Sequence, residues 1–371
     1  MLKFNKIICA IFFAGLLISC SSSHFNQRVK EGYDPKELLA LMPALERTYD
    51  SVDIAGFKTP EPKGMERVFR SKVTPLKNRF DVWRTSEKSA AITFRGTILD
   101  EKSLSFSAAF YYLMTPANGK IKLGESKWFE YKLSEVPGSG VHLGILLGLG
   151  LLSEELVAQI ENQHKQGIRD IILVGHSQGS GISILATAYL KYLQKEGKLP
   201  MDINFKTYSV ATPKIANFAF VCNYENLTRN YAFSVDSPLD WVPSIGITFQ
   251  SVNDFPPVSI FKDFKSFMSS IGYMPGKNYD SVYQQVSTDV PNLTKMMHNI
   301  VKENVYPRIL EVLPGYEEPE IMNSYNFERA GTHISLIPSE QYYKIFPNNP
   351  DNYQVWENHS VYPYYILLKE D

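Results

Sequence analysis

A serine between two glycines is the residue of this sequence best suited to nucleophilic chemistry. Ser177 lies in VGHSQGSG, with Gly175 two residues before it and Gly179 two residues after it. The apolar run IILV precedes this stretch and an apolar, periodic segment follows, which predicts a strand, a sharp turn and a helix. Small residues leave room for such a turn, and the backbone amide of Gln178 at the helix start can face a developing negative charge. The pattern predicts that Ser177 is a nucleophile rather than an idle serine in a glycine turn.

A nucleophilic hydroxyl also needs a base and a group that orients the base. Asp236 and Asp240 lie in SVDSPLDWVPS, after the expected strand NYAFSV, and the distance from the strand end favours Asp236. Either aspartate could instead cap a helix or form an Asx turn beside the prolines. Three histidines follow. His298 lies in an apolar helical pattern and is expected in the core or on the surface, whereas His333 begins an expected strand and His359 precedes an expected helix.

The elements around these residues indicate an α/β protein. The apolar segments at 89–97, 168–175 and 204–213 are expected strands, and the helical pattern after Ser177 joins the second to the third. A parallel connection of this kind predicts a mostly parallel central sheet with helices on both faces. Three further predictions are a helix over 141–167, a helix over 34–50 that Asp34 caps and Pro43 shortens, and a hairpin of 105–115 with 127–133 through a turn at 116–120.

Composition excludes some classes of function. Of 371 residues 44% are hydrophobic and 21% are charged, which is ordinary for a globular protein. The formal net charge of -1 provides no basic field for nucleic acid. The sequence contains neither an HExxH nor a CxxC pair and no phosphate-binding glycine loop, so no metal and no cofactor are expected. The oligomeric state stays open.

The first twenty residues are typical of an export signal. Lys3 and Lys6 precede the run IICAIFFAGLLIS, which is too short for a spanning helix of about 20 residues. The run ends in LISC, which resembles a bacterial lipobox and implies that Cys20 is the lipidated first residue of the mature protein. The alternative is an ordinary cleaved signal. The domain prediction is therefore a signal peptide at 1–20 and a single domain at 21–371, anchored in the bacterial cell envelope, in the outer membrane.

Five segments, in one order, resemble the class 3 (fungal-type) lipase family of the α/β-hydrolase superfamily. Together they cover about residues 88–245. VGHSQGSG resembles the TGHSLGG elbow, AITFRGT the oxyanion strand, VHLGI the VHxGF helix start, YSVATPKIAN the FGxPRxGN segment, and DWVP the DxVP of the catalytic aspartate.

The resemblance implies an α/β-hydrolase fold and assigns roles to residues. The match of DWVP to DxVP favours Asp240 as a partner of Ser177, with Asp236 as the alternate. The family's order of serine, aspartate and histidine leaves His298, His333 and His359, and the place of His359 near the C-terminus resembles that of the family's last catalytic residue, with His333 as the alternate. The resemblance also implies that Thr97 and the amide of Gln178 bind the oxyanion. Gln178 and Ser180 differ from the family's leucine and glycine, which affects acyl-chain preference and packing more than the reaction, because the oxyanion donor is a backbone amide. His176, next to the serine, is expected to be structural and to point away from the site.

The function implied is hydrolysis of carboxylic (acyl) esters by a lipase or esterase. Two alternatives stay open: an acyltransferase with the same residues, and a lipid-anchored binding or assembly protein that keeps the fold without activity. The expected partners are an ester or lipid substrate and, through Cys20, a membrane. Residues 246–330 have helical spacing and form either an insertion that caps the acyl pocket or additional core.

Overall fold

The computed structural model describes residues 28–50, 58–98, 108–246, 248–256, 258–272, 281, 283–347 and 355–371. The predicted signal peptide and Cys20 lie outside the described residues, as do residues 105–107 of the predicted hairpin.

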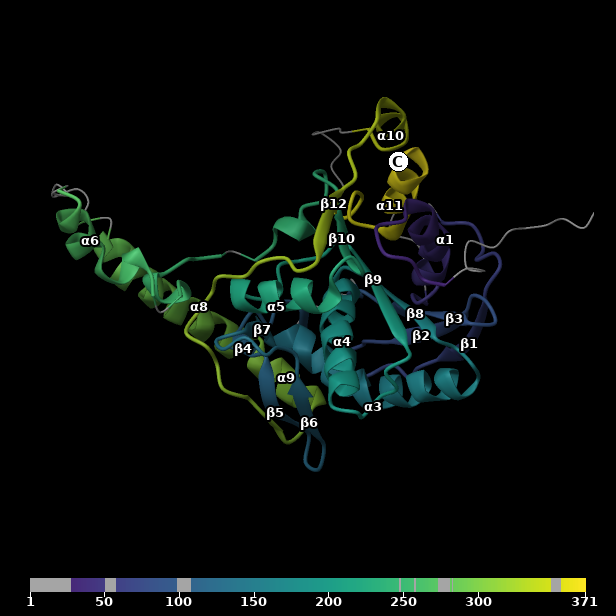
Figure 1. Ribbon diagram of the computed structural model, residues 1–371, viewed down its shortest axis with the longest axis horizontal. Coiled ribbons are helices and arrows are strands. Elements are labelled where there is room, and N and C mark those ends of the chain that lie inside the picture. The colour runs from purple at the N-terminus through teal and green to yellow at the C-terminus, as the bar shows by residue number, and fades with distance from the viewer. Residues whose placement is uncertain are drawn as a thin grey trace, which may run out of the picture.

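A single sheet organises the described chain. Seven described strands form it in the order β1-β2-β3-β8-β9-β10-β12 (Figure 1). β1, β2 and β3 pair antiparallel, whereas every neighbouring pair from β3 to β12 is parallel. The predicted mostly parallel α/β sheet is confirmed. The strands of this sheet are β1 Glu66–Arg70, β2 Phe80–Arg84, β3 Ser89–Phe94, β8 Asp170–His176, β9 Asn204–Val210, β10 Ala232–Asp236 and β12 Thr332–Ser335.

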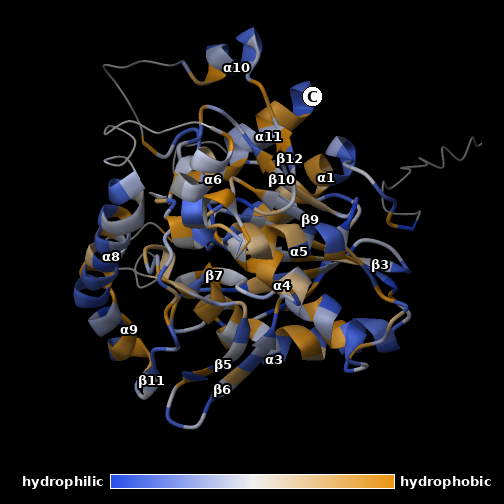
Figure 2. Cartoon of the chain, turned by 60° about the vertical axis from the view of Figure 1, so that its left-hand side comes forward, coloured by the Kyte–Doolittle hydropathy of each residue, from blue (hydrophilic) through white to orange (hydrophobic). Residues whose placement is uncertain are grey.

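Helices cover both faces of the sheet, with α1 and α11 together on one face and α3 and α4 on the other (Figure 1). Side chains of β8 alternate between the two cores, so that Ile171 and Leu173 join the cluster of α3 and α4, whereas Ile172 and Val174 join that of α1 and α11. Burial on both faces explains why this strand is a continuous apolar run, and Figure 2 shows the apolar residues concentrated between the layers. The helices of the body are α1 Pro35–Glu46, α3 Leu143–Lys165, α4 Gln178–Lys195, α5 Phe218–Thr228, α10 Glu340–Ile345 and α11 Val361–Glu370.

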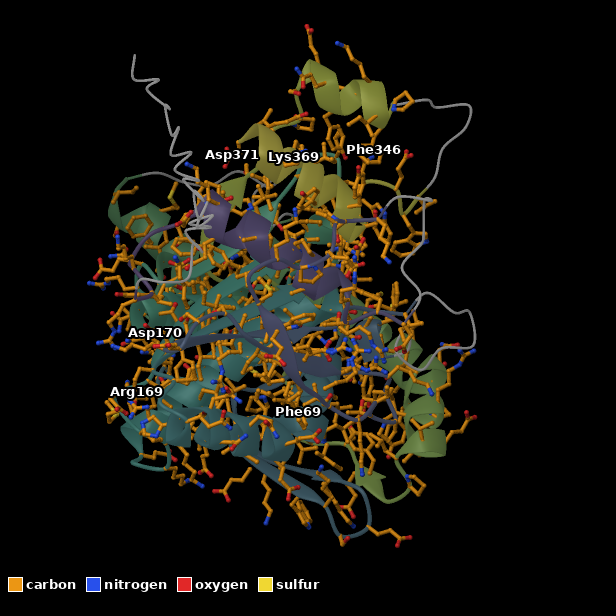
Figure 3. All side chains as sticks on the ribbon, turned by 90° about the vertical axis from the view of Figure 1, so that its right-hand side faces the viewer. Phe69, Arg169, Asp170, Phe346, Lys369 and Asp371 are labelled. Atoms are coloured by element: carbon orange, nitrogen blue, oxygen red, sulfur yellow. The ribbon has the colours of Figure 1, made fainter. Side chains whose placement is uncertain are left out.

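The predicted helix near the start of the chain is α1. Asp34 caps it by accepting hydrogen bonds from two amides of the first turn, and the helix ends three residues after Pro43, as expected. A buried ion pair fixes α1 to the sheet, with Glu37 Oε2 lying 2.7 Å from Lys206 Nζ of β9. Tyr208 donates its hydroxyl to the same carboxylate at 2.7 Å. In the same layer the ring of Phe346, which follows α10 and is labelled in Figure 3, packs against that of Tyr362 of α11, with ring centroids 6.2 Å apart.

The predicted hairpin was wrong. Met114–Pro116 (β4) pairs with Gly140–His142 (β7), and Trp128–Lys132 (β6) pairs instead with Asn118–Leu123 (β5), where a turn was expected. In β5 the apolar side chains of Ile121 and Leu123 are buried, while the intervening lysines face outward. This alternation, the periodicity of a strand, outweighs the local turn signal of Asn118 and Gly119.

Residues 246–330 contain the predicted helices but do not form one helical unit. α6 and α8 extend away from the sheet (Figure 1). The last part of the range returns to the body: Ile309 and Leu313 join the main core, β11 pairs with β5, and Tyr325 and Phe327 form a small cluster with β4. A capping role for the range stays a prediction. The short helix η1, Val242–Ser244, precedes this range. The elements within the range are η2 Val252–Asp254, η3 Ile260–Asp263, α6 Phe264–Ser270, η4 Gln285–Asp289, α8 Val290–Asn304, α9 Tyr306–Val312 and β11 Tyr316–Glu317.

One helix of the described chain, α3, is long and apolar enough to cross a membrane by length and composition. Two thirds of its most apolar window is buried (67%), and its residues pack against α4 and the sheet. This burial agrees with the prediction of a core helix rather than a membrane span.

Candidate active site

Ser177 occupies the turn between β8 and α4, and its backbone has φ 56° and ψ -126°. A side chain is strained in this conformation, which positions the serine at the tip of a strand-to-helix elbow. A side chain at either flanking glycine would clash with nearby backbone. A Cβ on Gly175 would lie 2.1 Å from the carbonyl oxygen of Gly179, and a Cβ on Gly179 would lie 2.3 Å from that of Phe94. The spacing of the two glycines is therefore a consequence of close backbone contact.

The structure brings Ser177, His359 and Asp240 into one hydrogen-bonded line. Ser177 Oγ lies 2.8 Å from His359 Nε2, and His359 Nδ1 lies 2.9 Å from Asp240 Oδ2. All three side chains are buried. Because a carboxylate can only accept, His359 carries its proton on Nδ1, and its Nε2 is free to accept the serine proton.

Asp240 is held by further donors. The Val242 amide donates to Oδ1 at 2.9 Å, and the Tyr364 hydroxyl of α11 donates to Oδ2 at 2.9 Å. Burial raises the pKa of Tyr364 well above its ordinary value, and the facing Asp240 acts in the same direction. Tyr364 therefore stays protonated and remains a donor. Sequence reasoning missed Tyr364, because a tyrosine in the apolar run YPYYILL has no signal that separates it from a core aromatic.

The alternates Asp236 and His333 contact each other. Asp236 Oδ2 lies 2.8 Å from His333 Nε2 and accepts from Arg329 at 3.0 Å, while Oδ1 accepts from the Thr212 amide. Within the described chain, neither alternate hydrogen-bonds to Ser177. His333 is also 41% exposed in its side chain, in contrast to the buried His359.

Of the two expected oxyanion residues, Gln178 directly follows the serine, and Thr97 follows a glycine that lies close to it. Thr97 follows the end of β3 after Gly96, and a Cβ on Gly96 would lie 3.2 Å from the Cβ of Ser177. Gln178 is the first residue of α4, and its side chain accepts from Asn78 Nδ2 at 3.2 Å. The helix begins at the serine, so its first amides and its dipole are directed toward this position.

Two tryptophan rings lie close to the ring of His359. The ring centroid of Trp356 lies 5.8 Å from that of His359, and the centroid of Trp241 lies 6.5 Å away. Trp241 also donates its indole N–H to the carbonyl of Val355 at 2.8 Å, which fixes the segment that carries the histidine. No group of three or more His, Cys, Asp or Glu side chains in the described chain is arranged to hold a metal ion.

The side chain of His176 contacts His359, with the two ring centroids 4.8 Å apart, so the expectation that it points away from the site was wrong. Its Nε2 is 2.6 Å from the carbonyl oxygen of His359, and its Nδ1 is 3.2 Å from the hydroxyl of Tyr49. Burial lowers the pKa of His176 to about 3, and the neighbouring His359 contributes in the same direction. The imidazole is therefore neutral at ordinary pH.

A mostly parallel sheet with a serine at a strand-to-helix elbow is the arrangement of the α/β-hydrolase fold. The sequence model of the family "Lipase (class 3)" matches residues 91–249, which include the elbow and Asp240 but not His359. This match supports a hydrolase of the lipase or esterase type. No curated protein sequence matches the chain significantly.

Solved lipases of fungi resemble the chain in structure at low identity. A lipase from Rhizopus microsporus var. chinensis is 19% identical, with 57% of this chain and 68% of that chain covered and a TM-score of 0.41. Lipase II from Rhizopus niveus is 18% identical, with 57% and 74% covered and a TM-score of 0.43. The Rhizomucor miehei lipase in its propeptide complex is 21% identical, with 59% and 66% covered and a TM-score of 0.41. Because these values are low, the roles of individual residues rest on the geometry of this chain.

Proposed function

We propose that this protein is a serine hydrolase that cleaves carboxylic (acyl) esters through an acyl-enzyme on Ser177. The observation that carries the proposal is the buried line of hydrogen bonds from Ser177 Oγ through His359 to Asp240, at 2.8 and 2.9 Å. A nucleophile, a base and a group that orients the base are the three parts that covalent acyl transfer needs.

In this proposal His359 Nε2 accepts the proton of Ser177 as the hydroxyl oxygen attacks the ester carbonyl. The oxyanion that forms accepts hydrogen bonds from the backbone amides of Gln178 and Thr97. His359 then gives the proton to the departing alcohol, which leaves the acyl group on Ser177. A water, deprotonated by the same nitrogen, releases the acid. Asp240 keeps the proton of His359 on Nδ1 and stabilises the imidazolium.

The test is hydrolysis of p-nitrophenyl esters from acetyl to palmitoyl by the chain that begins at residue 21. Ser177→Ala and His359→Ala should each lower kcat by about 10⁴-fold or more. Asp240→Asn should lower kcat by about 10⁴-fold, because the amide favours the wrong tautomer of His359. His333→Ala is the matched control and should retain activity, since His333 faces Asp236 rather than the serine.

Three outcomes would contradict parts of this proposal. Equal activity of wild type and Ser177→Ala, with no labelling of Ser177 by a fluorophosphonate, would favour a binding or assembly protein. Loss of activity in His333→Ala with full activity in His359→Ala would reassign the base. Ester exchange that exceeds hydrolysis when a primary alcohol is added at low concentration would favour an acyltransferase.

We further propose that the substrate is a lipid or another ester met at a membrane of the bacterial envelope, where Cys20 would hold the protein. The support is the LISC sequence after a signal-like apolar run. An alkyne-palmitate label on the full chain expressed in a bacterium tests the anchor. Label should be lost in Cys20→Ala and retained in Cys222→Ala. Equal labelling of wild type and Cys20→Ala would refute the anchor without bearing on hydrolysis.

A further inference from the structure

A second line of hydrogen bonds, half-buried at Tyr49, links the turn before Thr97 to the main chain of His359. It starts at the amide of Gly96, which donates to the Tyr49 hydroxyl at 3.0 Å. It continues from Tyr49 to His176 Nδ1 at 3.2 Å and from His176 Nε2 to the carbonyl oxygen of His359 at 2.6 Å. We propose that Tyr49 and His176 are positioning residues that fix the backbone of His359 and the turn before Thr97. This inference rests on the proposed function.

The direction of each hydrogen bond in this line follows from chemistry. The carbonyl oxygen of His359 can only accept, so His176 carries a proton on Nε2. His176 is neutral, because burial lowers its pKa to about 3, and its Nδ1 is therefore bare and accepts. The Tyr49 hydroxyl must then donate to Nδ1, and its oxygen lone pairs accept the Gly96 amide. Every donor and acceptor in the line has one consistent role.

The line connects the base and the oxyanion turn, two parts of the site whose relative positions the proposed reaction depends on. On one side it holds the main chain of His359, whose side chain contacts Ser177. On the other side it holds Gly96, the residue before Thr97. Space allows only glycine there, since a Cβ on Gly96 would lie 2.3 Å from the Tyr49 hydroxyl and 2.6 Å from the carbonyl of His176. A shift of the tyrosine would therefore be felt by both the base and the oxyanion turn.

Tyr49 is itself held by the residue that follows it. Asp50 accepts from Arg79 at 2.6 and 3.2 Å and from Arg95 at 3.1 Å. The hydrogen bond from Arg79 lowers the pKa of Asp50, so this carboxylate is ionised at neutral pH. Arg95 is fully buried and directly precedes Gly96. Two adjacent residues after α1, Tyr49 and Asp50, thus anchor the same strand end by independent contacts.

The test compares Tyr49→Phe, His176→Phe and His176→Gln with wild type on the best ester of the series. Both phenylalanine variants remove a link and should lower kcat by about 10- to 100-fold with KM within twofold, as for other misplaced groups. His176→Gln offers an amide N–H near the position of Nε2, can donate to the His359 carbonyl, and should recover most of the lost kcat. A role in stability alone predicts neither the kcat-specific effect nor this rescue.

Tyr192→Phe is the matched control. Tyr192 is fully buried, whereas Tyr49 is half-buried, and it likewise donates its hydroxyl in a hydrogen bond, to Asn223 at 3.0 Å. It lies fifteen residues after Ser177 on α4, about 22 Å along the helix. This variant should lose stability and keep kcat. Serine-dependent activity that Tyr49→Phe and His176→Phe leave unchanged would overturn the positioning roles only. Absence of serine-dependent activity in the wild type would overturn the proposed function and this inference together.

Discussion

Acid should destabilise this protein through its buried neutral histidines, and His176 provides a quantitative case. In the folded state burial lowers the pKa of His176 to about 3, whereas an unfolded histidine has a pKa of about 6.5. Between these values the unfolded chain binds a proton that the folded state does not bind. The free energy of unfolding therefore falls as the pH falls toward and below about 6.5, and it is fully retained only well above that value.

The magnitude follows from this difference in proton binding. At pH 5 roughly 97% of the unfolded imidazole is protonated, compared with about a quarter at pH 7, and the folded imidazole is neutral at both. The linkage relation then gives a loss of about 2 kcal/mol between pH 7 and pH 5 for this residue. His142 caps α3 through its Nδ1, is also buried, and has its pKa lowered to about 3 by burial, so it should contribute a similar loss.

Urea unfolding at pH 7, 6 and 5, followed by tryptophan fluorescence, measures this effect. The His176→Gln variant cannot titrate at this position, so between pH 7 and pH 5 it should lose about 2 kcal/mol less than wild type. Only the change with pH is compared, and any constant cost of the substitution cancels. His142→Asn should give the same difference at the other site. Parallel losses in wild type and His176→Gln would show that His176 is not a buried neutral histidine, and the directions assigned to its hydrogen bonds would fail with it.

Three further substitutions have defined outcomes. Tyr364→Phe removes a hydrogen-bond donor from Asp240, so it should lower kcat several-fold in ester hydrolysis and lower the free energy of unfolding in urea by about 1–2 kcal/mol. Unchanged values of both would show that Tyr364 does not support the site. Gly179→Ala forces a Cβ into backbone and should abolish soluble folded protein or cost more than about 3 kcal/mol, which circular dichroism and unfolding would detect. Lys206→Met leaves the buried Glu37 carboxylate with the Tyr208 hydroxyl but without its cation, and should cost about 3–5 kcal/mol, whereas adding Glu37→Gln should recover part of this loss.

The elbow was predictable from sequence because its residues are dictated by local geometry. Gly175 and Gly179 have no space for a side chain, because the backbones of the strand and the helix are in close contact there. The same contact therefore determines both the glycine pattern in the sequence and the turn in the structure. The choice between Asp236 and Asp240 was not settled by spacing. One aspartate ends β10 and the other follows four residues later, and only the tertiary fold brings Asp240, rather than Asp236, to His359.

Other features had no local signal. The hydroxyls of Tyr49 and Tyr364 hydrogen-bond to His176 and Asp240, but both rings also pack in the apolar layer of α1 and α11. A sequence pattern indicates that such a ring packs in the core and does not indicate which residue the hydroxyl contacts. The strand β5 was mistaken for a turn because Asn118 and Gly119 are strong turn residues, while the alternation that decides its conformation begins only after them.

The hydrogen bond between Ser177 and His359 joins positions 182 residues apart, and the one between His359 and Asp240 joins positions 119 residues apart. Closing such long loops is slow and comes late in folding. A molecule folded only through η1 (Val242–Ser244) would hold Ser177 and Asp240 without His359, and the hydroxyl of its Ser177 would be as unreactive as any other. Reactivity of Ser177 toward a fluorophosphonate would therefore count completely folded molecules, and during refolding it should rise after the fluorescence and circular dichroism signals of the sheet.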